Sequence, residues 1–76
     1  MVTAYILIEM VAGHSLDLVS SLSQTAPVRE VRRVTGPFDV IAVIQGKDLN
    51  AISDVVSTDV HTLPGVVRTT TCVRLE

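Results

Sequence analysis

Residues 28–45 read VREVRRVTGPFDVIAVIQ, and this stretch decides the fold. As a strand, residues 28–35 would point Val28, Glu30, Arg32 and Val34 to one side and Arg29, Val31, Arg33 and Thr35 to the other, and the charges on both sides are typical of a strand at the edge of a sheet. Gly36 and Pro37 are turn residues, and residues 38–45 are an apolar run rich in strand-forming types. We therefore predict a hairpin of two antiparallel strands joined by a tight loop.

Hydrophobic periodicity and end signals predict the remaining elements around this hairpin. Ser15 and Asp48 are residue types that cap helix N-termini, and Gly13 can end a strand because glycine accepts backbone angles that other residues resist. The elements predicted in this way are strands at 2–11 and 66–75 and helices at 16–24 and 49–58.

The order β-α-β-β-α-β contains two right-handed crossovers, which bring four strands into one antiparallel sheet. We therefore predict an α+β fold of the ferredoxin-like sandwich type, with both helices on one face of the sheet. The expected strand order is 4-1-3-2. It places residues 2–11 and 38–45 in the centre and the arginine-rich residues 28–35 at one edge.

Both central strands carry apolar side chains on both of their faces, although a sheet covered on one side should alternate apolar with polar residues. In the first strand Ala4, Ile6, Ile8 and Met10 oppose Tyr5, Leu7 and Val11, and in the third Phe38, Val40, Ala42 and Ile44 oppose Ile41 and Val43. Two short helices can bury only one face. We therefore predict an obligate dimer with its sheets packed face to face, a dimeric α+β barrel.

Composition narrows the class of protein. The 76 residues form one small domain, 1–76, with 47% hydrophobic residues and a net charge of -2, which disfavours direct nucleic-acid binding. The single Cys72 cannot form an internal disulfide and is expected to pack in the sheet, and no dense His or Cys cluster indicates a metal site. No apolar run is long enough for a membrane helix or resembles a signal peptide, so we expect a cytoplasmic protein without membrane contact.

Two segments together resemble a known family. Residues 31–43, VRRVTGPFDVIAV, and residues 63–75, LPGVVRTTTCVRL, are similar to the ligand-binding domain of the leucine-responsive/asparagine regulator (Lrp/AsnC) family, also called the RAM domain. The resemblance implies an amino acid effector, a homodimer assembling to an octamer or decamer, and a role in the regulation of amino acid metabolism. Family members carry a helix-turn-helix before this domain. Here the chain starts at the first strand, so we expect a stand-alone form.

The resemblance also implies a ligand site between dimers at the turn Thr35, Gly36, Pro37, Phe38 and Asp39. Asp39 can accept a bond from an ammonium group, the Gly36 backbone and the Thr35 hydroxyl can donate to a carboxylate, and Phe38 offers an apolar wall. The alternative is that Gly36 serves only the turn and Asp39 binds only backbone there.

Thr69 and Thr71 are further candidate ligand-binding hydroxyls, although threonine is also an ordinary strand former. We predict no catalytic residues, cofactor or metal, and hence a binding and oligomerisation module that is not an enzyme. Two alternatives remain open. One is a scaffold subunit that assembles with full-length Lrp/AsnC paralogues. The other is a small dimeric α+β barrel enzyme, such as a cofactor-free monooxygenase, which sparse histidines disfavour.

Overall fold

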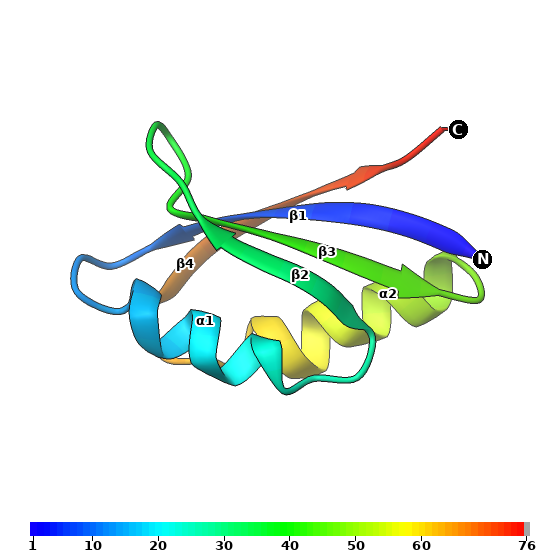
Figure 1. Ribbon diagram of the computed structural model, residues 1–76, viewed down its shortest axis with the longest axis horizontal. Coiled ribbons are helices and arrows are strands. Elements are labelled where there is room, and N and C mark those ends of the chain that lie inside the picture. The colour runs from blue at the N-terminus through cyan, green and yellow to red at the C-terminus, as the bar shows by residue number, and fades with distance from the viewer. Residues whose placement is uncertain (76) are drawn as a thin grey trace.

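The computed structural model describes residues 1–75, which form one antiparallel sheet with its helices on a single side (Figure 1). The strand order is β2-β3-β1-β4, so the predicted order and the ferredoxin-like sandwich are confirmed. The elements are β1 (Val2–Met10), α1 (Ser15–Ser23), β2 (Val28–Arg33), β3 (Val40–Gly46), α2 (Leu49–Val55) and β4 (Val66–Val73).

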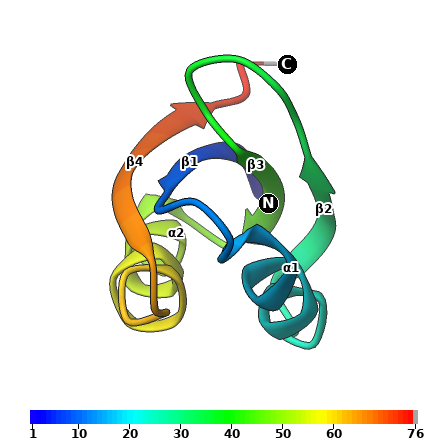
Figure 2. The same ribbon diagram turned by 90° about the vertical axis from the view of Figure 1, so that its left-hand side faces the viewer.

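The hydrophobic core lies between the sheet and the helices. It is built from alternate residues of the central strands, because successive strand side chains point to opposite faces and only one face meets α1 and α2. Figure 2, an end-on view, shows both helices on the same side of the sheet, below it. The fully buried side chains include Ile6, Ile8, Leu22, Val40, Ile44, Ile52 and Val60.

The connection between β2 and β3 is longer than predicted. β2 ends at Arg33 and β3 begins at Val40, so residues 34–39 form an open loop that rises above the bare face of the sheet (Figure 1). The Val34 amide donates to the Asp39 carbonyl at 2.9 Å and closes the base of this loop. Strand pairing therefore stops two residues earlier on each side than in a tight hairpin.

β2 contains a β-bulge, so its side chains do not alternate between the two faces of the sheet along the whole strand as predicted. Val28 pairs with Ile44 and Val31 pairs with Ala42, so both valines face the helices although three positions separate them. The register shift between Val28 and Glu30 inserts one extra residue, which reverses the facing of the strand at that point.

One of the two predicted helix N-caps is confirmed. The Asp48 carboxylate accepts a hydrogen bond from the Ala51 amide at 2.8 Å, as expected for an N-cap. The prediction for Ser15 is wrong, because α1 begins at Ser15 itself and His14 occupies the N-cap position without a side-chain bond. The second helix also extends past residue 58, as a π-helical segment, Val56–Val60.

β4 forms the edge opposite β2, and this placement leaves Cys72 exposed in the single chain rather than packed as predicted. None of the helices within residues 1–75 has the length and apolar character needed to cross a membrane.

Gly65 closes the core at the start of β4 by a close backbone approach. Its carbonyl accepts from the Val11 amide at 2.7 Å, and its φ of +89° lies in the region that favours glycine. A Cβ at this position would lie 2.7 Å from both Cβ and Cγ of His14. His14, which fails to cap α1 through its side chain, therefore packs directly against this glycine.

We expect Gly65→Ala to destabilise the fold more than Gly13→Ala. Both glycines have nearly the same positive φ, so both changes carry a backbone cost of about 1–2 kcal/mol. Only Gly65→Ala also collides with His14, which adds about 1–3 kcal/mol. Urea unfolding of the two variants measures the difference, and equal destabilisation would show that the His14 contact relaxes freely.

Candidate functional site

The loop 34–39 borders a hollow of about 380 Å³ at one end of the sheet. The hollow is open to solvent on one side. Its walls come from the end of β2, the loop itself and the first residue of α1, which starts at this end because α1 follows directly after β1. The lining residues are Ser15, Arg33, Val34, Thr35 and Asp39.

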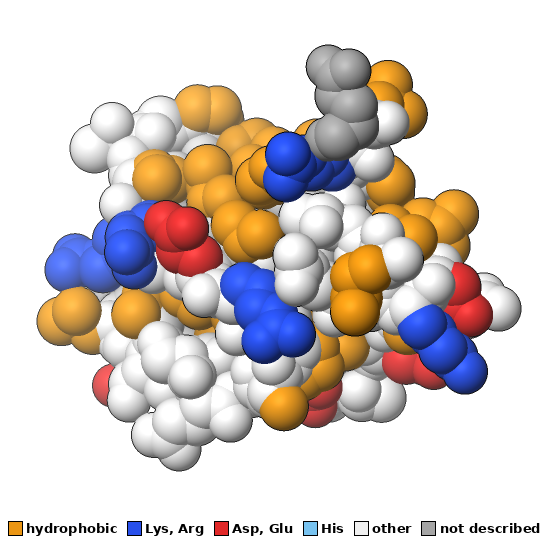
Figure 3. Space-filling model, turned by 45° about the vertical axis from the view of Figure 1, so that its right-hand side comes forward, with side chains coloured by type: hydrophobic (Ala, Val, Ile, Leu, Met, Phe, Trp, Pro, Cys, Tyr) orange, Lys and Arg blue, Asp and Glu red, His pale blue; other side chains and the backbone are white. Residues whose placement is uncertain are grey.

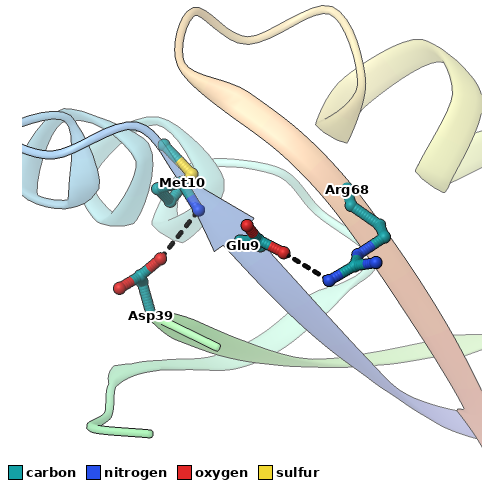
Figure 4. Close-up of polar contacts among 4 residues, drawn as sticks. All are labelled: Glu9, Met10, Asp39 and Arg68. Carbon is teal, nitrogen blue, oxygen red and sulfur yellow. Dashed lines mark hydrogen bonds and ion pairs between the residues drawn. The ribbon is translucent and has the colours of Figure 1, made fainter. Parts of the chain in front are cut away.

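Asp39 makes three hydrogen bonds, two to the central strand β1 and one across the base of the loop. Its carboxylate Oδ2 accepts from the Met10 amide at 2.8 Å (Figure 4). Its own amide donates to the Ile8 carbonyl at 2.9 Å, and its carbonyl accepts from Val34. The side chain of Asp39 thus takes the place of a backbone acceptor where the pairing of β1 with β3 ends.

The predicted turn residues divide into two groups. Thr35 and Asp39 line the hollow, whereas Gly36 and Pro37 are exposed at the tip of the loop. Phe38 is half-buried next to Asp39 and is not among the lining residues of the hollow. Gly36 has a φ of +111° with open space around its α-carbon, so its positive angle serves the loop conformation rather than a close contact.

The predicted threonines of β4 lie away from this hollow. Thr69 pairs with Ile8, on the other side of β1 from β3, and its hydroxyl lies 2.8 Å from Nε2 of His61. Thr71 lines a separate shallow groove between β4 and the second helix, together with Leu49 and Val56. One chain therefore does not bring these hydroxyls together with Thr35 and Asp39.

Two lining residues, Ser15 and Arg33, were not among the predicted site residues. Arg33 is the last residue of β2; from the sequence, the arginines of this strand could bind anions or form ion pairs between dimers, but a solvated charged edge is the default interpretation. Ser15 was interpreted only as a helix cap. The topology held a signal for Ser15. β1 and β2 are both antiparallel to β3 and so run in the same direction, which places the start of the helix after β1 at the same end of the sheet as the loop after β2.

The bare face of the sheet carries its own charged pairs beside the candidate site. Arg68 of β4 contacts Glu9 of β1 at 2.7 Å, one residue before the Met10 amide that binds Asp39 (Figure 4). Arg32 lies 3.5 Å from Glu30 on the opposite edge. Within residues 1–75 no group of three or more His, Cys, Asp or Glu side chains is placed to hold a metal ion.

The family model of the Lrp/AsnC ligand binding domain matches residues 3–76. The chain belongs to this family. No curated protein matches the sequence.

Solved structures similar to this Lrp/AsnC domain agree with the fold. A protein from Thermus thermophilus is 34% identical with a TM-score of 0.94, over 100% of this chain and 95% of that chain. Escherichia coli AsnC is 20% identical with a TM-score of 0.91, over 99% of this chain and 51% of its own. A transcriptional regulator from Neisseria meningitidis, solved as a complex with L-methionine, is 21% identical with a TM-score of 0.89, over 99% of this chain and 50% of its own.

We expect Asp39→Ala to free the Met10 amide from its only side-chain acceptor. A part-buried N–H group without its acceptor costs about 1–3 kcal/mol, so the free energy of unfolding should fall by an amount in this range. The Met10 amide should also exchange with solvent faster, whereas the Ile6 amide in the middle of β1 should change little. Hydrogen exchange followed by NMR measures both, and unchanged exchange at Met10 would contradict the structural role of this carboxylate.

Proposed function

We propose that this Lrp/AsnC domain is a regulatory module that binds a free amino acid in the hollow beside loop 34–39 and forms oligomers through its sheet. The observation that carries the proposal is the hollow itself, in which the Asp39 carboxylate lies with hydroxyl groups and an apolar wall. Such a set of groups matches a small polar ligand with one apolar side chain.

Asp39 has the capacity to bind an ammonium group in addition to its structural bond. An ionised carboxylate offers about four acceptor positions, and the Met10 amide uses one of them. The Thr35 hydroxyl can donate to the ligand carboxylate, and Val34 in the wall of the hollow can contact its side chain. The Gly36 backbone and Phe38 lie outside the lining, so they would contact only a part of the ligand that extends beyond the hollow. Thr69 and Thr71 lie outside this hollow, so a ligand could meet them only across a subunit boundary.

The L-methionine complex of the Neisseria meningitidis regulator supports an amino acid as the ligand class. The hollow of this chain is open on one side, as expected for a site that a second subunit completes. A site shared between subunits couples occupancy to assembly, because a ligand that binds only the assembled form stabilises that form. We therefore propose that the amino acid biases assembly of dimers toward octamers or decamers.

The bare face of the sheet has the composition of a dimer interface. From the strand register, Tyr5 lies beside Val43 and Leu7 beside Ile41, and all four side chains are half-buried in the single chain. The ion pairs of Arg68 with Glu9 and of Arg32 with Glu30 lie on this face toward its two edges, as polar groups do at the rim of known interfaces. Figure 3 shows apolar side chains interspersed with charged ones on the side of the molecule that it presents. Each aliphatic side chain gains up to about 1.5–3 kcal/mol on full burial, so a second copy with the same face is the partner of choice.

We expect at least one of the twenty amino acids to raise the melting temperature of the wild-type chain in a thermal-shift panel. Asp39→Asn should lose this response, because it removes the charge that holds the ammonium group. The Asn side-chain oxygen can still accept from the Met10 amide, so the basal melting temperature should change little.

Sedimentation of the same samples measures whether the ligand also changes assembly size. A wild-type chain that responds to no amino acid contradicts the ligand proposal. If the same chain still assembles with a helix-turn-helix paralogue, the result favours a role as a scaffold subunit over a role in ligand binding.

We expect Leu7→Lys to convert the dimer into a monomer, because it places a charge at the apolar centre of the proposed interface. Leu16→Lys is the matched control, since Leu16 is 64% exposed on α1, on the other side of the sheet. Sedimentation measures the state of each variant, and circular dichroism checks that both are folded. A folded wild-type chain that sediments as a monomer at cellular concentration would exclude the proposed dimer.

Cys72 offers an independent measure of the same face. It pairs with Tyr5 on the bare side of the sheet and is exposed in the single chain. Its reaction with a thiol reagent should slow as the wild-type concentration rises, and it should stay fast in Leu7→Lys at every concentration.

A further inference from the structure

The hollow beside loop 34–39 contains one positive and one negative side chain that do not neutralise each other. Arg33 and Asp39 both line it, yet within residues 1–75 no ion pair joins them at 4.0 Å or less. Asp39 instead binds the Met10 amide, which holds its carboxylate at the end of β1. The two oppositely charged residues therefore line one hollow without an ion pair between them.

Arg33 is also exceptional among the arginines of the described chain. Arg29 donates to the Gln45 side chain, Arg32 lies against Glu30, Arg68 against Glu9, and Arg74 has a contact of its own. Within residues 1–75, the Arg33 guanidinium is the one arginine head group that makes neither a hydrogen bond nor an ion pair. Its guanidinium keeps its five donors available to a ligand in the hollow.

The register of β2 explains why Arg33 reaches the hollow and its neighbour does not. Arg33 pairs with Val40, which is fully buried, so this position faces the helices and the start of α1. Arg32 pairs with Ile41 and faces the bare side of the sheet, where Glu30 accompanies it. Two consecutive arginines thus serve opposite faces of one strand.

A free α-amino acid carries an ammonium and a carboxylate on the same carbon atom. A site for this zwitterion needs an acceptor and a donor that face the same space without cancelling each other. The planar guanidinium binds a carboxylate through two parallel hydrogen bonds, which makes arginine the best side chain for this purpose. Ser15 and Thr35 add hydroxyl groups to the same walls.

We propose that Arg33 anchors the carboxylate of the ligand while Asp39 binds its ammonium group. This inference rests on the proposed function and deepens it, because it assigns the side chain that binds the carboxylate of the free amino acid. Carboxamides and esters of amino acids lack the negative charge, so they lose the contact with Arg33 and retain only the contact with Asp39. The Thr35 hydroxyl then assists the carboxylate contact and does not provide it alone.

The test compares wild type, Arg33→Gln and Arg32→Gln against the twenty amino acids and their carboxamides at millimolar concentration. Arg32→Gln is the matched control, because it removes the same charge from the adjacent residue on the opposite face. Thermal shift identifies the amino acid that binds, and calorimetry gives its affinity and that of its carboxamide for each variant. Circular dichroism confirms that the variants are folded, which is expected because both side chains are exposed.

We expect Arg33→Gln to weaken the binding of the amino acid by about 10-fold to 100-fold, the loss expected for a charge-assisted hydrogen bond. Its carboxamide should bind wild type and Arg33→Gln about equally, and Arg32→Gln should resemble wild type with both compounds. Equal affinity of wild type and Arg33→Gln for the amino acid would overturn the role of Arg33 and leave the proposed function standing. Absence of binding by every amino acid would overturn both.

Discussion

The structure depends on one geometric constraint: two short helices can cover only one face of a four-stranded sheet. The helices bury one set of alternate residues in β1 and β3, and these residues form the core together with the apolar side chains of the helices and Val31. The intervening residues are nearly as apolar, yet the single chain leaves them half-exposed. Apolar side chains that remain exposed to water favour association with another surface. The residues between the core positions of β1 and β3 therefore favour the binding of a second chain.

Asp39 connects this sheet to the candidate site. Its carboxylate binds the Met10 amide, and its backbone binds both Ile8 and Val34, so the base of loop 34–39 is tied to the central strand. A ligand that engages this carboxylate would act on a group that already holds β1 in place. Glu9 and Arg68 pair on the bare face one residue away, which places the site close to the proposed dimer interface.

Local patterns predicted the sheet order, the helix-covered face and the Asp48 cap, because each follows from residues that are neighbours in sequence or from side-chain alternation. The bulge in β2 was not predictable in this way. Val28 and Val31 both face the helices, where their apolar side chains pack against the core. The extra residue of the bulge lets two positions of unlike parity face the same side. Similarly, Ser15 has good capping chemistry, but α1 begins one residue earlier than predicted, at Ser15 itself, and the N-cap position falls on His14, which packs against Gly65.

The sequence by itself determined the fold, the two-faced character of the central strands and the residues of the turn, since periodicity and turn chemistry are local properties. Only the tertiary structure decided which polar side chains meet. Thr35 and Asp39 share a hollow with Arg33 and Ser15, whereas Thr69 and Thr71 lie across the sheet from it. The physical reason is that side-chain neighbours in a sheet depend on strand register and on crossover connections, which join residues that are distant in the chain.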